Sequence, residues 1–382
     1  QLSMRVGDIP YYEAIQGNKG VIKPKYDLQK DVFKGVLNEL DQANDLFSKG
    51  ADISGDFIYS GNVDKWRRLV NSFELYVLIN LYKKTSDSDL NVVNKFKEVA
   101  QRPLMRDYKD NFAITYNGTK GYCYPWSNTA ADLNPFTQYT MLSTTYINLL
   151  KENQDRRLFY VAEPAESLLA EGKIESNFDA YIGVEPSDEY SNIIDKKNKK
   201  EYSDMNKRYV ELATAEPVGL FCHWDMEFLL AEAAVRGWID DDAQTHYFNG
   251  IRSSMSFYAN FVPAKYTHGI TIDQSYINSY LSSVMLNGTL ENKIKQIIHQ
   301  KYMAGFFQNR YQAWFEFRRT GYPEFILNPS TNMNPTDNTK FPIRWQYPQN
   351  EIDYNTDNLN EAIQRQYNGR DDFNGIMWIL KD

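Results

Sequence analysis

Phe228-Leu229-Leu230-Ala231-Glu232-Ala233-Ala234-Val235-Arg236-Gly237-Trp238 is the stretch of the sequence that says most about the fold. Leu and Ala are strong helix formers, and glycine is favoured just past a helix end, so the stretch predicts a helix over about 223–237. Its small side chains let another helix approach closely, and we expect a partner helix over about 241–259. The centre of the chain is therefore predicted to be a pair of packed helices.

Amphipathic helices are expected on both sides of this pair. Apolar residues recur at three- and four-residue spacing and predict helix pairs near 27–84, 223–260 and 273–319, with a single helix over 290–319 in the last pair. Three stretches lack such periodicity and are expected to be irregular: 103–135, 160–215 and 320–382. Helix pairs that cannot bury their apolar faces alone stack on one another, so the fold class expected is all-α, with long irregular excursions between the pairs.

Composition and charge exclude several classes of function. The chain has 42 Lys and Arg against 50 Asp and Glu, and its net charge of -8 argues against a nucleic-acid partner. Two cysteines, Cys123 and Cys222, are too few for a disulfide framework or a Cys-rich zinc site. The four histidines have no metal-ligand spacing, and no apolar run of about 18 residues is present that would span a bilayer.

No sequence motif of an enzyme is found either. The phosphate-binding, dinucleotide-binding, zinc-protease and serine-hydrolase patterns are all missing, so we expect no catalytic residues, no cofactor and no metal. Asp52-Ile53-Ser54-Gly55-Asp56 resembles the start of a calcium loop but lacks the remaining ligands, and we expect a turn there. A structural calcium ion elsewhere stays open, as does a glycan hydrolase with a pair of carboxylates.

Charged motifs are expected to be structural. Arg318 and Arg319 precede Gly321, and we interpret them as residues that close a helix C-terminus and pair with carboxylates. The run from Asp195 to Lys200 is expected to be a solvated loop.

An aromatic loop is the candidate binding site. Aromatic residues make up 15% of the chain, and Trp126 lies in a polar, Asn-rich segment where its ring is able to stack on a sugar. The ligand-binding residues proposed from this segment are Tyr122, Tyr124, Trp126, Asn128, Asp132 and Asn134. The alternative is that Trp126 packs against the end of the helical array.

Several segments, in order along the chain, resemble the SusD/RagB family. Gly7-Asp8-Ile9-Pro10-Tyr11 is similar to an early family motif, and Tyr59 to Trp66 is similar to a second one. The helix from Phe228 to Trp238 and the segment from Arg318 to Pro323 are also close to family patterns. One departure is Arg156, which stands where the family usually has proline.

The resemblance implies a fold and a function. It implies one SusD-like domain over 1–382, built from tetratricopeptide-like helix pairs and lacking its natural N-terminal part. Members are outward-facing outer-membrane lipoproteins, so a lipid anchor is expected upstream of Gln1. They capture oligosaccharides, or in some cases peptides, for a SusC-like TonB-dependent transporter, and they are not enzymes. A protein-binding scaffold is a further, weaker alternative.

Overall fold

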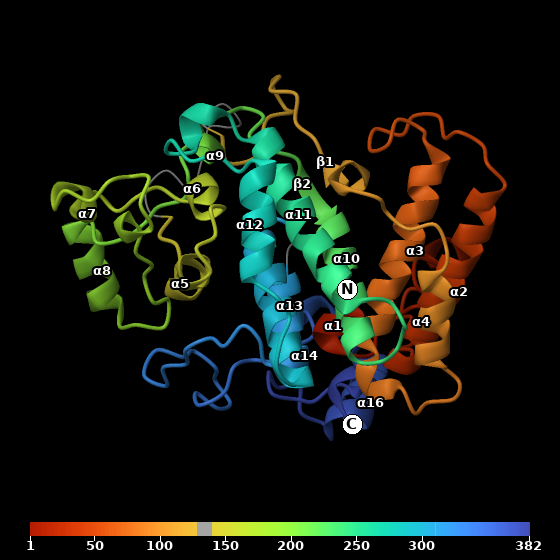
Figure 1. Cartoon of the computed structure of the whole chain (residues 1–382). Helices are drawn as coiled ribbons and strands as arrows, with labels where there is room; N and C mark the ends of the chain where they lie inside the picture. Colours follow the sequence, from red (N-terminus) through yellow and green to blue (C-terminus); the bar gives the residue numbers. More distant parts are fainter. Residues whose placement is uncertain (128–139, 310) are drawn as a thin grey trace. The chain divides into compact units, whose positions relative to one another are not determined.

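The computed structural model describes residues 1–127, 140–309 and 311–382 of the chain (Figure 1). The described chain is mostly helical, which confirms the all-α fold class with tetratricopeptide-like helix pairs. The contacts of the described residues divide the chain into two compact units. Unit 1 comprises Gln1–Ala51, Val70–Pro103 and Leu327–Asp382, and unit 2 comprises Asp52–Leu69 and Leu104–Ile326.

Unit 1 is built around the long helix α2. Its elements are α1 (Ser3–Val6), η1 (Gly17–Lys19), α2 (Gln29–Ser48), the larger part of α3 (Val63–Asn80), η2 (Tyr82–Lys84), α4 (Val92–Ala100), α15 (Gln349–Tyr354), α16 (Thr356–Tyr367) and η6 (Trp378–Leu380). The two ends of the chain meet inside this unit. Trp345 donates its backbone N–H to the carbonyl of Arg5 at 2.8 Å, and Arg365 pairs with Asp8 at 2.6 Å. Buried Arg344 lies 4.1 Å from the ring of Tyr367.

The end of the chain is more helical than expected. Residues 320–382 were predicted to be irregular, but α15 and α16 lie within them. The prolines that suggested irregular structure all lie at or before Pro348. In α16, Leu359, Ala362 and Ile363 are buried, because three- and four-residue spacing places them on one helix face.

Unit 2 contains the helical pair that the sequence predicted. Its elements, after the first turns of α3, are η3 (Tyr108–Asp110), β1 (Phe112–Ile114), α5 (Thr144–Glu152), α6 (Leu158–Val161), α7 (Glu166–Ala170), η4 (Phe178–Ala180), α8 (Tyr190–Lys199), α9 (Arg208–Glu211), β2 (Val218–Phe221), α10 (His223–Val235), α11 (Ala243–Phe261), η5 (Ala264–Tyr266), α12 (Gln274–Ser283), α13 (Leu290–Ala304) and α14 (Gln312–Thr320). Helix α10 packs against both α11 and α13, which lie beside it in Figure 1. A Cβ at Gly250 of α11 would lie 2.7 Å from the ring of Phe228, so only glycine permits this close approach.

The helix predicted over 290–319 is two helices. The apolar stripe of Ile294, Ile297 and Ile298 belongs to α13, which ends at Ala304, and α14 begins only at Gln312. Between them Phe307, Asn309 and Tyr311 adopt positive φ angles of 54°, 43° and 71°. Such angles are incompatible with a continuing right-handed helix.

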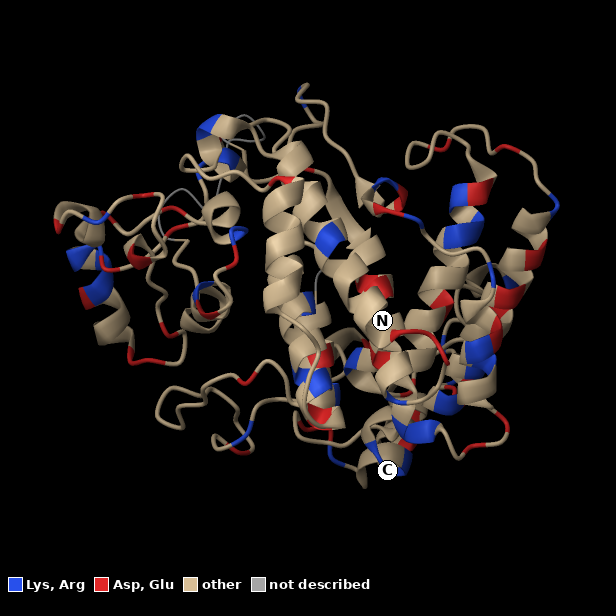
Figure 2. Cartoon of the chain, viewed as in Figure 1, with Lys and Arg blue, Asp and Glu red and all other residues tan. Residues whose placement is uncertain are grey.

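The segment 160–215 is also more ordered than expected. It contains the end of α6 and four further short helical elements, and the run from Asp195 to Lys200 closes α8 instead of forming a loop. Figure 2 shows both acidic and basic positions on this helix, which has no buried residue. The run is therefore solvated, as expected, but helical. Strands β1 and β2 pair antiparallel in a two-stranded sheet.

Candidate functional site

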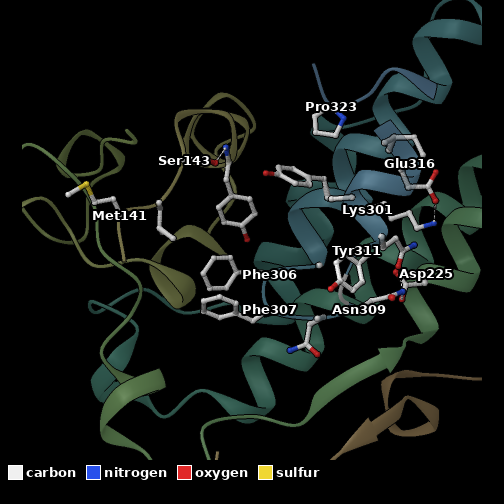
Figure 3. A pocket seen from close by; sticks show the side chains of 18 residues that line it. Met141, Ser143, Asp225, Lys301, Phe306, Phe307, Asn309, Tyr311, Glu316 and Pro323 are labelled. Carbon is white, nitrogen blue, oxygen red and sulfur yellow. Dashed lines mark hydrogen bonds and ion pairs between the residues drawn. The ribbon is translucent and has the colours of Figure 1, made fainter. Parts of the chain in front are cut away.

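A cavity of about 310 Å³ in unit 2 is the candidate functional site (Figure 3). It lies where the start of α5 faces the segment that joins α13 to α14. Its lining residues are Met141, Leu142, Ser143, Tyr146, Asp225, Ile298, Lys301, Tyr302, Gly305, Phe306, Phe307, Gln308, Asn309, Tyr311, Gln312, Ala313, Glu316 and Pro323. A space of this volume is at the lower end of the range for small-molecule sites.

One wall of the cavity is aromatic. The rings of Phe306 and Phe307 lie 4.2 Å apart, and Tyr146 stacks on Phe306 at 5.2 Å. We call Phe306 and Phe307 the aromatic wall. Behind it, the ring of Tyr209 lies 5.6 Å from Phe306 and 5.1 Å from Phe307. The wall is thus held by packed rings on the side away from the cavity.

Two charged residues of the cavity neutralise each other. Lys301 pairs with Glu316 at 2.7 Å, and both are buried. Burial acts to raise the pKa of Glu316, but the charges of Arg319 and Lys301 outweigh it and lower that pKa to about 2. Burial raises the pKa of Asp225, and the nearby Lys301 ammonium opposes this shift. Figure 3 shows this charged group on the opposite side of the aromatic wall from Met141.

Arg319 pairs with carboxylates near the end of α14, as expected, whereas Arg318 stacks on an aromatic ring. Arg319 forms an ion pair with Glu232 of α10 and a hydrogen bond with Glu316 through its Nε at 3.0 Å. Gly321 closes α14 in the left-handed conformation, with φ of 83°. Arg318 stacks over Trp314 at 4.0 Å.

The predicted binding residues differ in how far they are exposed to solvent. Tyr122 is 67% exposed, Tyr124 is 1% exposed, and Trp126 is half-buried. The indole of Trp126 contacts Phe307 with ring centroids 3.9 Å apart, so it adjoins the aromatic wall. Tyr124 packs against Trp126 and Tyr209 and presents no open face to a ligand. Asn128, Asp132 and Asn134 lie outside the described residues.

Sequence reasoning missed the aromatic wall itself. Phe306 and Phe307 were placed inside a continuous helix, where aromatic residues are most simply read as core. Gly305 was the available signal that the helix ends there. The residues after it do not continue the helical apolar spacing: Phe306, Phe307, Gln308 and Asn309.

The histidines of α10 and α11 meet at one carboxylate. His223 Nε2 lies 3.3 Å from Glu227, and His246 Nδ1 lies 2.7 Å from the same carboxylate. Burial acts to raise the pKa of Glu227, but both imidazoles outweigh it and lower the value to about 2. This cluster joins α10 to α11 and lies among buried side chains.

A second cavity in unit 2, of about 570 Å³, is more polar. Its lining residues are Thr140, Glu163, Pro164, Glu166, Leu169, Glu175, Lys200, Tyr202, Asp204, Met205, Lys207, Val210 and Glu211. Lys200 and Lys207 pair with Glu166 and Glu163 across it. Its described lining holds a single aromatic residue, Tyr202, so it offers less ring surface to a sugar than the first cavity does.

Metal and membrane features were sought across residues 1–127, 140–309 and 311–382. Within those ranges no group of three or more His, Cys, Asp or Glu side chains is arranged to hold a metal ion. Asp56, from the segment resembling a calcium loop, accepts backbone N–H bonds from Ile58, Tyr59 and Gly61 and so closes a turn, as expected. Among the described helices, none combines the length and apolar character needed to cross a membrane.

Comparison with known proteins places the chain among binding proteins of the outer membrane. A SusD-like family model described as "Starch-binding associating with outer membrane" matches residues 1–348. A SusD homolog from Bacteroides fragilis is 41% identical, with a TM-score of 0.94 over 99% of this chain and 81% of that chain. Another from the same species is 36% identical, with a TM-score of 0.88 over 100% of this chain and 81% of that one. A chitin-binding protein is 26% identical, with a TM-score of 0.80 over 100% of this chain and 78% of its own. No curated protein matches the chain.

Proposed function

This chain belongs to the SusD-like family, and on that premise we propose that it captures oligosaccharides at the cell surface and passes them to a SusC-like, TonB-dependent transporter. The description of the family names binding and no reaction, which supports a binding protein in preference to an enzyme. A lipid anchor on the outward face of the outer membrane would hold the protein beside that transporter.

The observation that carries this proposal is the aromatic wall beside a neutralised polar group. The wall of Phe306 and Phe307 offers apolar ring faces of the kind that pack against sugar rings. Gln312 is buried, lines the cavity, and has an amide nitrogen without a hydrogen-bond partner, so it is available to donate to a hydroxyl or acetamido oxygen. Lys301 and Glu316 neutralise each other, and a neutral ligand suits such a site better than an ion.

The test is calorimetric titration of the chain with starch-type and chitin-type oligosaccharides and with a mixed peptide pool. We expect saturable binding of one glycan class, and loss of at least tenfold in affinity for Phe307→Ala. The matched control is Trp345→Ala, because Trp345 is an aromatic residue of unit 1 that is 41% exposed.

Three results would decide against parts of the proposal. Binding of peptides alone would select the peptide alternative. Glycan binding that is unaffected by Phe307→Ala would place the site away from the cavity. New reducing ends appearing during incubation with a glycan would show a hydrolase.

A further inference from the structure

The segment that carries the aromatic wall is strained and needs an anchor. Phe307, Asn309 and Tyr311 all have positive φ angles, a conformation that is unfavourable for residues other than glycine and most of all for bulky ones such as Phe307 and Tyr311. Such a conformation persists only where the surrounding structure holds it in place. The contacts of Gln308, between two of these residues, supply that hold.

Gln308 uses both ends of its amide on the neighbouring chain. Its Oε1 accepts the backbone N–H of Gly219 in β2 at 2.5 Å, and its Nε2 donates to Oε1 of Glu216 at 3.0 Å. The next residue, Asn309, donates its backbone N–H to the carbonyl of Gly219 at 2.8 Å. The segment that carries the aromatic wall is therefore attached to residues 216–219 by three hydrogen bonds. Gln308 lines the cavity, but its amide is bonded to the protein.

Glu216 is itself fixed in position. It is fully buried and pairs with Arg208 at 2.6 Å, and it accepts the hydroxyl of Tyr209 at 3.1 Å. The ring of the same tyrosine supports Phe306 and Phe307 from behind. The polar anchor and the aromatic support of the wall thus share one residue.

We infer that Glu216 and Gln308 are positioning residues, which set the place of the aromatic wall and through it the affinity for the ligand. This inference rests on the proposed function for its effect on binding. Neither residue needs to touch the ligand, because both ends of the Gln308 amide are bonded to protein atoms.

Two measurements on the same variants test the inference. Gln308→Met keeps the length of the side chain and removes both hydrogen bonds, and Gln274→Met on the exposed surface of α12 is the matched control. Titration gives the affinity for the glycan that the wild type binds. The fluorescence emission of Trp126 reports the position of the aromatic wall without any ligand, because its indole contacts Phe307. This emission is isolated by subtracting the spectrum of the same protein that carries Trp126→Phe.

For Gln308→Met we expect at least tenfold weaker binding together with a shifted Trp126 spectrum, and for Gln274→Met neither. We expect Glu216→Gln to weaken binding as well, because it removes the buried charge that holds Arg208 beside the anchor. If Glu216→Gln does not fold, Gln308→Met still decides.

Two results would overturn the inference. One is wild-type affinity and an unchanged Trp126 spectrum in Gln308→Met. The other is weaker binding with an unchanged spectrum, which would make Gln308 a direct ligand contact. If the wild type binds no glycan, the proposed function fails, but the spectrum still tests whether Gln308 positions the wall.

Discussion

The indole of Trp126 lies against the ring of Phe307 at a centroid distance of 3.9 Å, with the ring planes inclined by 62°. These residues are far apart in the sequence, and their contact connects the aromatic loop found by sequence reasoning to the wall of the cavity. An aromatic pair contributes about 0.5–1.5 kcal/mol beyond the area it buries. Truncation of Trp126 should therefore loosen the wall.

We expect Trp126→Ala to weaken glycan binding about threefold to tenfold, which corresponds to the loss of one aromatic pair. Trp126→Phe should retain most of the affinity, because it keeps a ring against Phe307. Calorimetry with the glycan that binds the wild type measures both. Equal glycan affinity in Trp126→Ala and the wild type would show that Trp126 does not contribute to the binding site.

Glycan affinity should change little with ionic strength. Lys301 and Glu316 of the cavity are buried and paired at 2.7 Å, so this pair presents little net charge to a ligand. We expect less than a twofold change in Kd between about 0.05 and 0.5 M salt, whereas attraction between exposed charges is screened over this range. A steep salt dependence would point to an ionic ligand.

The stability of the protein should decrease as the pH rises past the range in which His246 titrates. Burial acts to lower the pKa of His246, but Glu227 and Asp241 raise it above its usual 6.5. A raised folded pKa stabilises the protein below pH 6.5, and this contribution is lost as the pH rises through the folded pKa.

Urea unfolding at a series of pH values checks this prediction with two variants. His246→Gln should remove the decline. His299→Gln is a control of opposite sign, because burial lowers the pKa of His299 and so favours the fold above the usual pKa. An unchanged pH profile in His246→Gln would contradict the prediction.

Removal of Arg319 should be costly. This side chain is buried between Glu232 and Glu316, and Arg319→Gln would leave these carboxylates without their main cation. Loss of one partner of a buried ionic group lowers the free energy of unfolding by about 3–5 kcal/mol. Lys295→Gln, which breaks a pair with Glu324 on the surface, should cost less than about 1 kcal/mol. Chemical denaturation of both variants measures the contrast, and equal losses would contradict it.

Gly183→Ala should disturb the mouth of the cavity. A Cβ at Gly183 would lie 2.5 Å from the Cα of Thr144, and the neighbouring Ser143 lines the cavity. Because a backbone atom cannot move aside as a flexible side chain does, we expect a lower melting temperature and weaker glycan binding. Gly17→Ala meets no atom within 4 Å and serves as the control. A wild-type melting temperature for Gly183→Ala would contradict the prediction.

Periodic apolar residues predicted the long helices well. The helix expected over 223–237 is found at His223–Val235, because its composition and terminal glycine are local signals. The break between α13 and α14 was not predictable in the same way. It depends on hydrogen bonds from Gln308 and Asn309 to residues 216–219, which lie far away in the sequence.

The candidate site could be predicted only in part. Trp126 was recognisable because an aromatic residue in a polar loop is unusual, but its contact with Phe307 is a tertiary one. Likewise, His223 and His246 share Glu227 because α10 and α11 pack side by side, although the spacing of the two histidines in the sequence suggests no relation. Local patterns predict helices, and sites made by distant segments escape them.

Unit 1 is assembled from three stretches of chain, the last of which begins at Leu327. A ribosome releases the chain from its N-terminus at about 5–20 residues per second, so every residue of unit 2 emerges before that last stretch. All residues of unit 2, which bears the cavity, are then present, whereas unit 1 still lacks Arg344, Tyr347 and Trp378. A premature stop shortly before Leu327 would therefore yield a polypeptide whose first 51 residues lack part of their packing partners, while every residue of the cavity-bearing unit is present.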